Sequence, residues 1–127
     1  MTDEKTRLYG LFTQLSREYR DALEYRYEAQ EALAESFAMA RDSEEKAHTL
    51  RARLSSNLPG KNADERAAAL VVILDEDSQY RELVEDGYRS RAAVADLQRQ
   101  IDKLDDQIKA LREHMRMLVA IAGRAAE

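Results

Sequence analysis

The side chains best suited to metal chemistry in this sequence are its histidines and a series of glutamates. Glu45 and His48 have the Glu-x-x-His spacing of helical di-iron proteins, in which both side chains project into the bundle core. Such a site needs a second pair, which a second copy of the chain would have to supply because Leu111 stands three residues before His114. The candidate additional carboxylates are Glu24, Glu28, Glu31 and Glu35. A carboxylate-bridged metal-binding bundle is therefore the least favoured hypothesis, and we expect no cofactor.

A second candidate for chemistry is the stretch from Pro59 to Asn62, in which Lys61 follows a glycine. A nucleotide-binding loop needs the pattern G-x-x-x-x-G-K-[ST] after a strand. No glycine stands five residues before Gly60, and Asn62 occupies the Ser/Thr position. We therefore interpret the stretch as a turn between helices.

Arginine and tyrosine alternate along residues 16–29, a combination that could contact phosphates and stack on bases. The six residues are Arg17, Tyr19, Arg20, Tyr25, Arg26 and Tyr27. Arginine and tyrosine are also enriched at protein–protein hot spots. Acidic residues in the same turns would repel a phosphate backbone, whereas a protein interface tolerates mixed charge. The six residues are a candidate face for a protein partner, with nucleic acid as the alternative.

The composition places these residues on long helices. The chain has 127 residues, of which 35% are charged and 6% aromatic, as in coiled-coil proteins. Its length suits a single domain. The net charge of −5 lacks the basic footprint expected of a duplex-DNA binder. The absence of cysteine excludes disulfides, thiolate catalysis and cysteine-ligated metals.

The sequence favours neither an enzyme nor a membrane protein. It shows no Ser/His/Asp constellation, and a narrow helical bundle offers few pockets of enzyme size. No apolar run approaches the ~20 residues that span a bilayer. The charged N-terminus lacks the apolar segment of a signal peptide. We expect a non-enzymatic, cytoplasmic protein without a membrane partner.

The positions of apolar residues and helix breakers predict an all-α hairpin in one domain. We expect a helix over 3–56, a turn over 57–62, a short helix over 63–74 and a long helix over 79–123, with a break or kink at 75–78. Two long helices joined by a tight turn pack antiparallel. In the first helix the apolar residues follow helical steps, but their phase drifts in the middle. They are Leu8, Leu11, Leu15, Ala22, Leu33, Phe37, Ala40, Ala47 and Leu54.

The residues of the turn each have a conformational reason. Asn57 is suited to the left-handed position that follows a helix. Pro59 keeps the residue before it out of the helical region. Gly60 completes the turn, and Asn62 then caps the short helix, with Glu65 three residues later forming a capping box.

The last helix carries a coiled-coil seam with strictly alternating steps of three and four. Its residues are Val94, Leu97, Ile101, Leu104, Ile108, Leu111, Met115 and Leu118. This repeat of 3.5 residues implies a left-handed supercoil. Continued backward, the register falls on Gly87, where we expect a bend or a close packing contact because glycine costs about 1 kcal/mol in a helix interior.

Several apolar residues need a covering surface that one hairpin does not provide. The run Ala67–Leu74 is apolar on every side of its helix, which predicts a buried helix. Other large residues do not all fit one seam: Phe12, Tyr19, Leu23, Tyr27, Val119 and Ile121. We therefore expect a dimer or higher oligomer, with a four-helix arrangement on dimerisation.

The turn and the segment after it resemble a pattern in small helical coiled-coil proteins encoded by phages and prophages. In that group a Gly-Lys-Asn turn leads to an arginine, a short apolar helix, an acidic break and a tyrosine. Here these are Gly60, Lys61, Asn62, Arg66 and Tyr80. The resemblance implies an accessory role in phage recombination or DNA metabolism in a bacterial host, and it transfers no catalytic residue.

The sequence as a whole favours an oligomeric scaffold or adaptor that acts through protein–protein contacts. Its expected partners are a second copy of itself and another protein. The alternative is a nucleic-acid-associated accessory protein that uses the arginine and tyrosine residues of 16–29.

Overall fold

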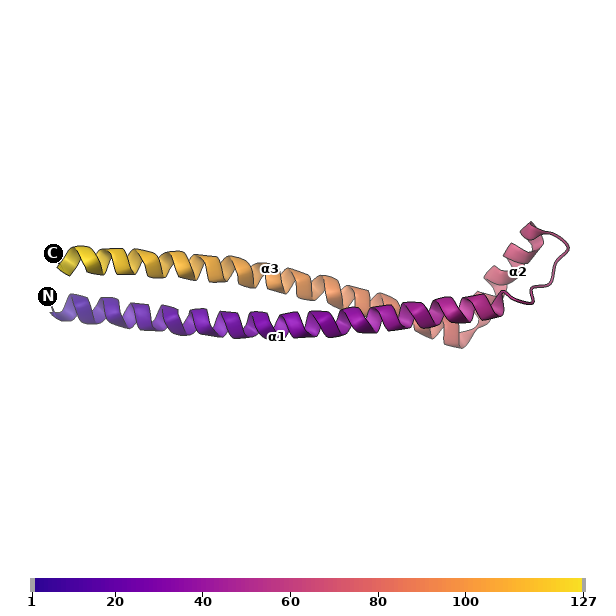
Figure 1. Ribbon diagram of the computed structural model, residues 1–127, viewed down its shortest axis with the longest axis horizontal. Coiled ribbons are helices and arrows are strands. Elements are labelled where there is room, and N and C mark those ends of the chain that lie inside the picture. The colour runs from indigo at the N-terminus through magenta and orange to yellow at the C-terminus, as the bar shows by residue number, and fades with distance from the viewer. Residues whose placement is uncertain (1, 127) are drawn as a thin grey trace. The chain divides into compact units, whose positions relative to one another are not determined.

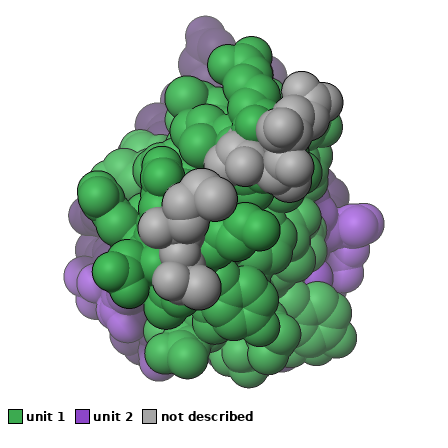
Figure 2. Space-filling view, turned by 90° about the vertical axis from the view of Figure 1, so that its left-hand side faces the viewer, with its two compact units in different colours: residues 1–32, 97–127 green, residues 33–96 purple. Residues whose placement is uncertain are grey.

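The computed structural model describes residues 2–126, with side chains for residues 3–124, and these residues form three helices and no strand. The helices are α1 (Thr2–Leu54), α2 (Ala63–Glu76) and α3 (Ser78–Ala126) (Figure 1). The expected all-α fold is confirmed. The chain divides into two compact units, one made of residues 1–32 and 97–127 and the other of residues 33–96 (Figure 2). They are called unit 1 and unit 2 below.

Unit 1 is an antiparallel pair formed by the start of α1 and the end of α3. Its core consists of Ala22, Ile108 and Leu111, with Leu15 and Tyr19 packed against it. Ala22 is only 2% exposed. An alanine opposite two large aliphatic residues allows the two helices to approach closely and still fill the space between them.

Two polar contacts fix the register of unit 1. The Ser16 hydroxyl donates to the Met115 sulfur at 3.7 Å. Further along, Arg26 Nε lies 2.5 Å from Asp105 Oδ1. Residue numbers rise along α1 as they fall along α3, so the pair is antiparallel, as the hairpin prediction requires.

Unit 2 contains the end of α1, the turn, α2 and the start of α3. Here Arg91 of α3 reaches Glu44 of α1 through both Nε and a terminal nitrogen. The same guanidinium lies 4.9 Å from the centre of the Phe37 ring. Gly87 is buried, and a Cβ placed on it would lie 3.7 Å from the Glu44 side chain. The helices of unit 2 therefore also run antiparallel, with the expected packing contact at Gly87.

The seam residues of α3 point inward as a set. Ile101, Ile108, Leu111 and Leu118 are buried. The other four are half-buried: Val94, Leu97, Leu104 and Met115. The strict spacing identified the inward face because each large side chain on this helix needs a place in the seam.

The matching stripe on α1 is continuous, so the expected drift in its phase is wrong. Apart from Ser16 and Ala32, the buried and half-buried positions of α1 follow alternating steps of three and four. They are Leu8, Phe12, Leu15, Tyr19, Ala22, Arg26, Ala29, Leu33, Ser36, Ala40, Ser43, Ala47, Leu50 and Leu54. Leu11 and Phe37, which we expected in the stripe, are 40% and 42% exposed. Alanine, serine and an arginine occupy the middle of the stripe, which hid its period.

The end of α1 differs from the expected one. The helix stops at Leu54, and the hydroxyls of Ser55 and Ser56 donate to the carbonyl oxygens of Ala52 and Arg53. The expected left-handed conformation of Asn57 is wrong, since the only positive φ among the described residues is the 137° of Gly60. The serine hydroxyls donate to carbonyl groups at the end of the helix, which in a left-handed cap would accept from backbone N–H groups instead.

Asn62 caps α2 in the expected way. Its Oδ1 accepts from the backbone N–H of Glu65 at 2.9 Å. The Glu65 carboxylate accepts from the N–H of Lys61 at 2.7 Å, one residue earlier than in a standard capping box. Both bonds satisfy donors at the start of a helix that would otherwise have no partner.

The break between α2 and α3 is a single residue, Asp77, rather than a segment. Helix α2 continues to Glu76 and α3 begins at Ser78. Asp77 lies in an extended conformation, and its carboxylate accepts from the N–H of Tyr80 at 2.8 Å. An aspartate in this position caps the following helix, which explains why one residue is enough to separate the two.

Candidate functional site

Helix α2 is the most unusual surface of unit 2, because its apolar side chains are only partly covered: Leu70, Ile73 and Leu74 are half-buried. None of its residues is buried, and Val71 and Val72 are 67% and 54% exposed. The expectation that this helix is buried is wrong for the single chain. An isolated helix of this length is marginal in water, and burial of an apolar face is the usual source of its stability.

An apolar groove lies between α2 and the start of α3, with a volume of 730 Å³. It is lined on the α2 side by Val71, Val72 and Leu74, and on the α3 side by Tyr80, Val84 and Tyr88. The charged residues at its edge are Arg51, Asp75, Arg81 and Glu85. An apolar floor with a mixed-charge edge is the usual organisation of a protein interface.

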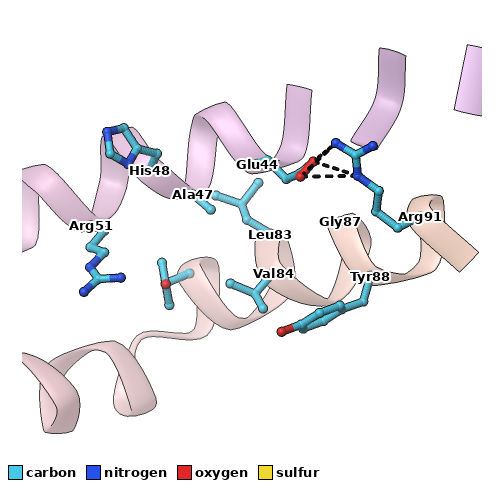
Figure 3. A pocket seen from close by; sticks show the side chains of 10 residues that line it. Glu44, Ala47, His48, Arg51, Leu83, Val84, Gly87, Tyr88 and Arg91 are labelled. Carbon is cyan, nitrogen blue, oxygen red and sulfur yellow. Dashed lines mark hydrogen bonds and ion pairs between the residues drawn. The ribbon is translucent and has the colours of Figure 1, made fainter. Parts of the chain in front are cut away.

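A second hollow of 350 Å³ adjoins this groove between α1 and α3 (Figure 3). Ala47 and Gly87 leave room for it, and the Glu44–Arg91 pair lies at one end with Arg51 at the other (Figure 3). Glu44 already accepts both bonds that Arg91 donates. The remaining lining is mixed, with Leu83 and Val84 beside His48, Tyr80 and Tyr88.

The candidate metal ligands do not form a site within the described residues. Glu45 and His48 are exposed on α1, and His114 is exposed on α3 in unit 1. Among residues 2–126 no three His, Asp or Glu side chains gather closely enough to hold a metal ion.

The arginines and tyrosines of 16–29 do not share one face. Tyr19 packs on the core of unit 1, where its hydroxyl accepts from Arg112 at 3.3 Å. Arg26 is paired with Asp105. These two residues belong to the helix pair, and the other four lie exposed around α1: Arg17, Arg20, Tyr25 and Tyr27.

Tyr27 is also engaged on its own helix. A hydrogen bond to the Glu31 carboxylate, together with the negative charge of that group, raises the pKa of the Tyr27 phenol above its ordinary value. The phenol that was a candidate for stacking on a base thus interacts with a carboxylate one helical turn away.

No protein-family model, curated protein or solved structure matches this chain. None of the described helices is long and apolar enough to cross a membrane.

Proposed function

We propose that this protein is a non-enzymatic, self-associating coiled-coil scaffold that works through protein–protein contacts. The observation that carries the proposal is α2, a helix with an eight-residue apolar run and no buried residue. Its cap residues and the single-residue break at Asp77 hold it as a separate element beside the paired helices of unit 2 (Figure 1).

The exposed surface of the chain supports the same proposal. The chain exposes 9794 Å². A compact monomer of 14.6 kDa exposes about 6,900 Å² by the relation of surface to mass, which leaves an excess of about 2,900 Å². Stable homodimers bury about 2,000–5,000 Å² in total, or about 1,000–2,500 Å² on each chain, so one self-interface would cover a large part of the excess.

Large apolar residues are exposed in both units of the chain. Thirteen of them are exposed among the described residues: Tyr9, Leu11, Leu23, Tyr25, Tyr27, Phe37, Met39, Val71, Val72, Tyr88, Met117, Val119 and Ile121. Of these, Val71, Val72 and Tyr88 line one groove of unit 2, and contiguous apolar surface of this kind marks interaction sites.

Sedimentation of the wild type and of Val71→Ala/Val72→Ala over a concentration series tests the proposal. Alanine favours helix more than valine does, so the double variant removes apolar area without weakening α2. We expect a wild-type oligomer and at least tenfold weaker association in the variant. Leu23→Ala, a position 42% exposed in unit 1, is the matched control for loss of apolar area.

Two results would contradict the proposal. One is a wild-type monomer at all concentrations. The other is an oligomer that the double valine variant leaves unchanged, because α2 would then contribute nothing to assembly.

A further inference from the structure

The two ends of α2 are acidic. Asp64 and Glu65 lie in its first turn, and Asp75 and Glu76 in its last. With Arg66 as the only base in the helix, four acids and one base give α2 a net charge of −3. Two α2 helices laid antiparallel would bring acidic ends together at both ends, so the charges of α2 do not favour pairing with itself.

A surface of opposite character lies in unit 1. Two adjoining hollows of 400 and 350 Å³ share Phe12 of α1 and Val119 of α3. Their charged lining residues are all cationic: Lys5, Arg112, which also donates to Tyr19, and Arg116, which also pairs with Glu113 on its own helix. No acidic side chain among the described residues lines either hollow. These two hollows are called the unit 1 groove.

The apolar floor of the unit 1 groove is open to a partner. Val119 is 59% exposed and Tyr9 is 75% exposed. The α3 residues of the groove run from Arg112 to Ala122, which at 1.5 Å per residue is about 15 Å of helix. The apolar run of α2 spans about 10.5 Å on the same scale, so it fits the floor while its acidic ends reach the cations.

We propose that α2 of one copy docks in the unit 1 groove of a second copy, and that the second copy returns the same contact. This inference rests on the proposed self-association and names the two surfaces that meet. A reciprocal exchange gives a closed two-fold dimer, in which each α2 covers Phe12 and Val119 of its partner. Asp75 and Glu76 then lie beside Arg112 and Arg116 of the second copy. The opposite side of the docked α2 continues to line the groove of its own unit 2.

Disulfide trapping tests the contact directly because the chain has no cysteine. Val72→Cys and Val119→Cys, one with a mass tag, are mixed in a glutathione buffer that keeps disulfide exchange at equilibrium. We expect the mixed disulfide between positions 72 and 119 to dominate over the symmetric disulfides 72–72 and 119–119. Tyr25→Cys, 60% exposed and outside the groove, is the control and should not form a mixed disulfide with Val72→Cys.

Charge reversal gives a second, independent readout. Asp75→Lys/Glu76→Lys and Arg112→Glu/Arg116→Glu each place like charges in the contact, and we expect about tenfold weaker self-association or more for each. A chain with all four changes restores opposite charges and should recover association. Arg17→Glu/Arg20→Glu, a reversal on the exposed side of α1, is the matched control with unchanged association. Circular dichroism checks that each variant keeps its helix content.

The outcomes separate this inference from the proposed function. If the wild type is an oligomer, two results overturn the reciprocal contact and leave the scaffold proposal standing. One is that disulfides between two copies of position 72 dominate, and the other is that the fourfold charge variant does not recover association. A wild-type monomer overturns both.

Discussion

Helices α2 and α3 both carry large apolar residues, but among the described residues only α3 buries any of them fully against the rest of the chain. The seam of α3 buries Ile101 to 3% and Ile108 to 7% exposure. On α2, which has the longest apolar run in the chain, Val71 and Val72 stay more than half exposed. Burial of a helix therefore depends on the spacing of its apolar residues and on a helix packed opposite them, and not on how many apolar residues it has.

Helix α1 explains why α3 is buried and α2 is not. Along α1 a stripe of alanine, serine and a few large residues accepts the isoleucines and leucines of α3. That stripe ends with α1 at Leu54, before the turn begins. Helix α2 follows the turn, and its contacts within unit 2 leave Leu70, Ile73 and Leu74 half-buried and Val71 and Val72 exposed.

The largest expected effect comes from shortening a buried seam residue. Ile101→Ala should lower the free energy of unfolding by about 2–5 kcal/mol, since a buried methyl-rich side chain is replaced by a cavity. Met117→Ala, at a position 60% exposed on the same helix, should change it by about 0.5 kcal/mol or less. Urea unfolding at one fixed protein concentration measures both. Equal effects would mean that the seam does not hold α3.

A smaller effect should follow from removing the cap of α2. Asn62→Ala removes the acceptor of the Glu65 N–H and should weaken α2 by about 1 kcal/mol. The measurement is amide hydrogen exchange within α2, where protection should fall by about fivefold. Asn57→Ala, in the turn outside α2, is the matched control and should leave that protection unchanged. Loss of protection in both variants would show that the turn, rather than the cap, stabilises α2.

The sequence predicted the parts of the fold whose physical signal is strong. Large aliphatic residues at strict spacing revealed the seam of α3, and Asn62 with Glu65 revealed the start of α2. The stripe on α1 was missed because alanine and serine carry little hydropathy contrast and because Arg26 occupies one of its positions. The exposure of α2 was missed because burial depends on what stands opposite a helix, which its own residues do not specify.

The candidate site was predicted only in part. The need of Ala67–Leu74 for a covering surface was visible in the sequence, whereas the unit 1 groove was not. Lys5, Arg112 and Arg116 come together only because the two helices are antiparallel, with residues about a hundred positions apart in one surface. The alternation of arginine and tyrosine suggested one face, but helical geometry distributes those residues around α1.

Gly87→Ala should raise the free energy of unfolding modestly, whereas Ile101→Ala lowers it. A Cβ at this position would meet the Glu44 side chain at 3.7 Å, an ordinary van der Waals distance. Alanine should therefore add up to about 1 kcal/mol to stability through its helix propensity. Thermal unfolding measures the gain. Destabilisation would show that α1 and α3 need glycine for closer contact in unit 2.

The smallest expected effect concerns Tyr27 in unit 1. Its raised pKa means that the bond to Glu31 stabilises the protein fully below the ordinary tyrosine pKa of about 10 and is lost as pH rises through the higher folded value. Glu31→Gln should bring the Tyr27 pKa back toward 10, which an NMR titration of the phenol carbon follows. An unchanged pKa in Glu31→Gln would exclude the carboxylate as the cause.

The central claim is that a second copy of the chain covers α2. Amide hydrogen exchange of the wild type at several protein concentrations tests it most directly, because α2 and α3 are followed in one experiment. We expect the amide protection of Leu70–Leu74 to rise with protein concentration. It should rise more steeply than the protection of Ile101–Leu111, which the chain buries by itself. Protection of α2 that is independent of concentration would contradict the claim.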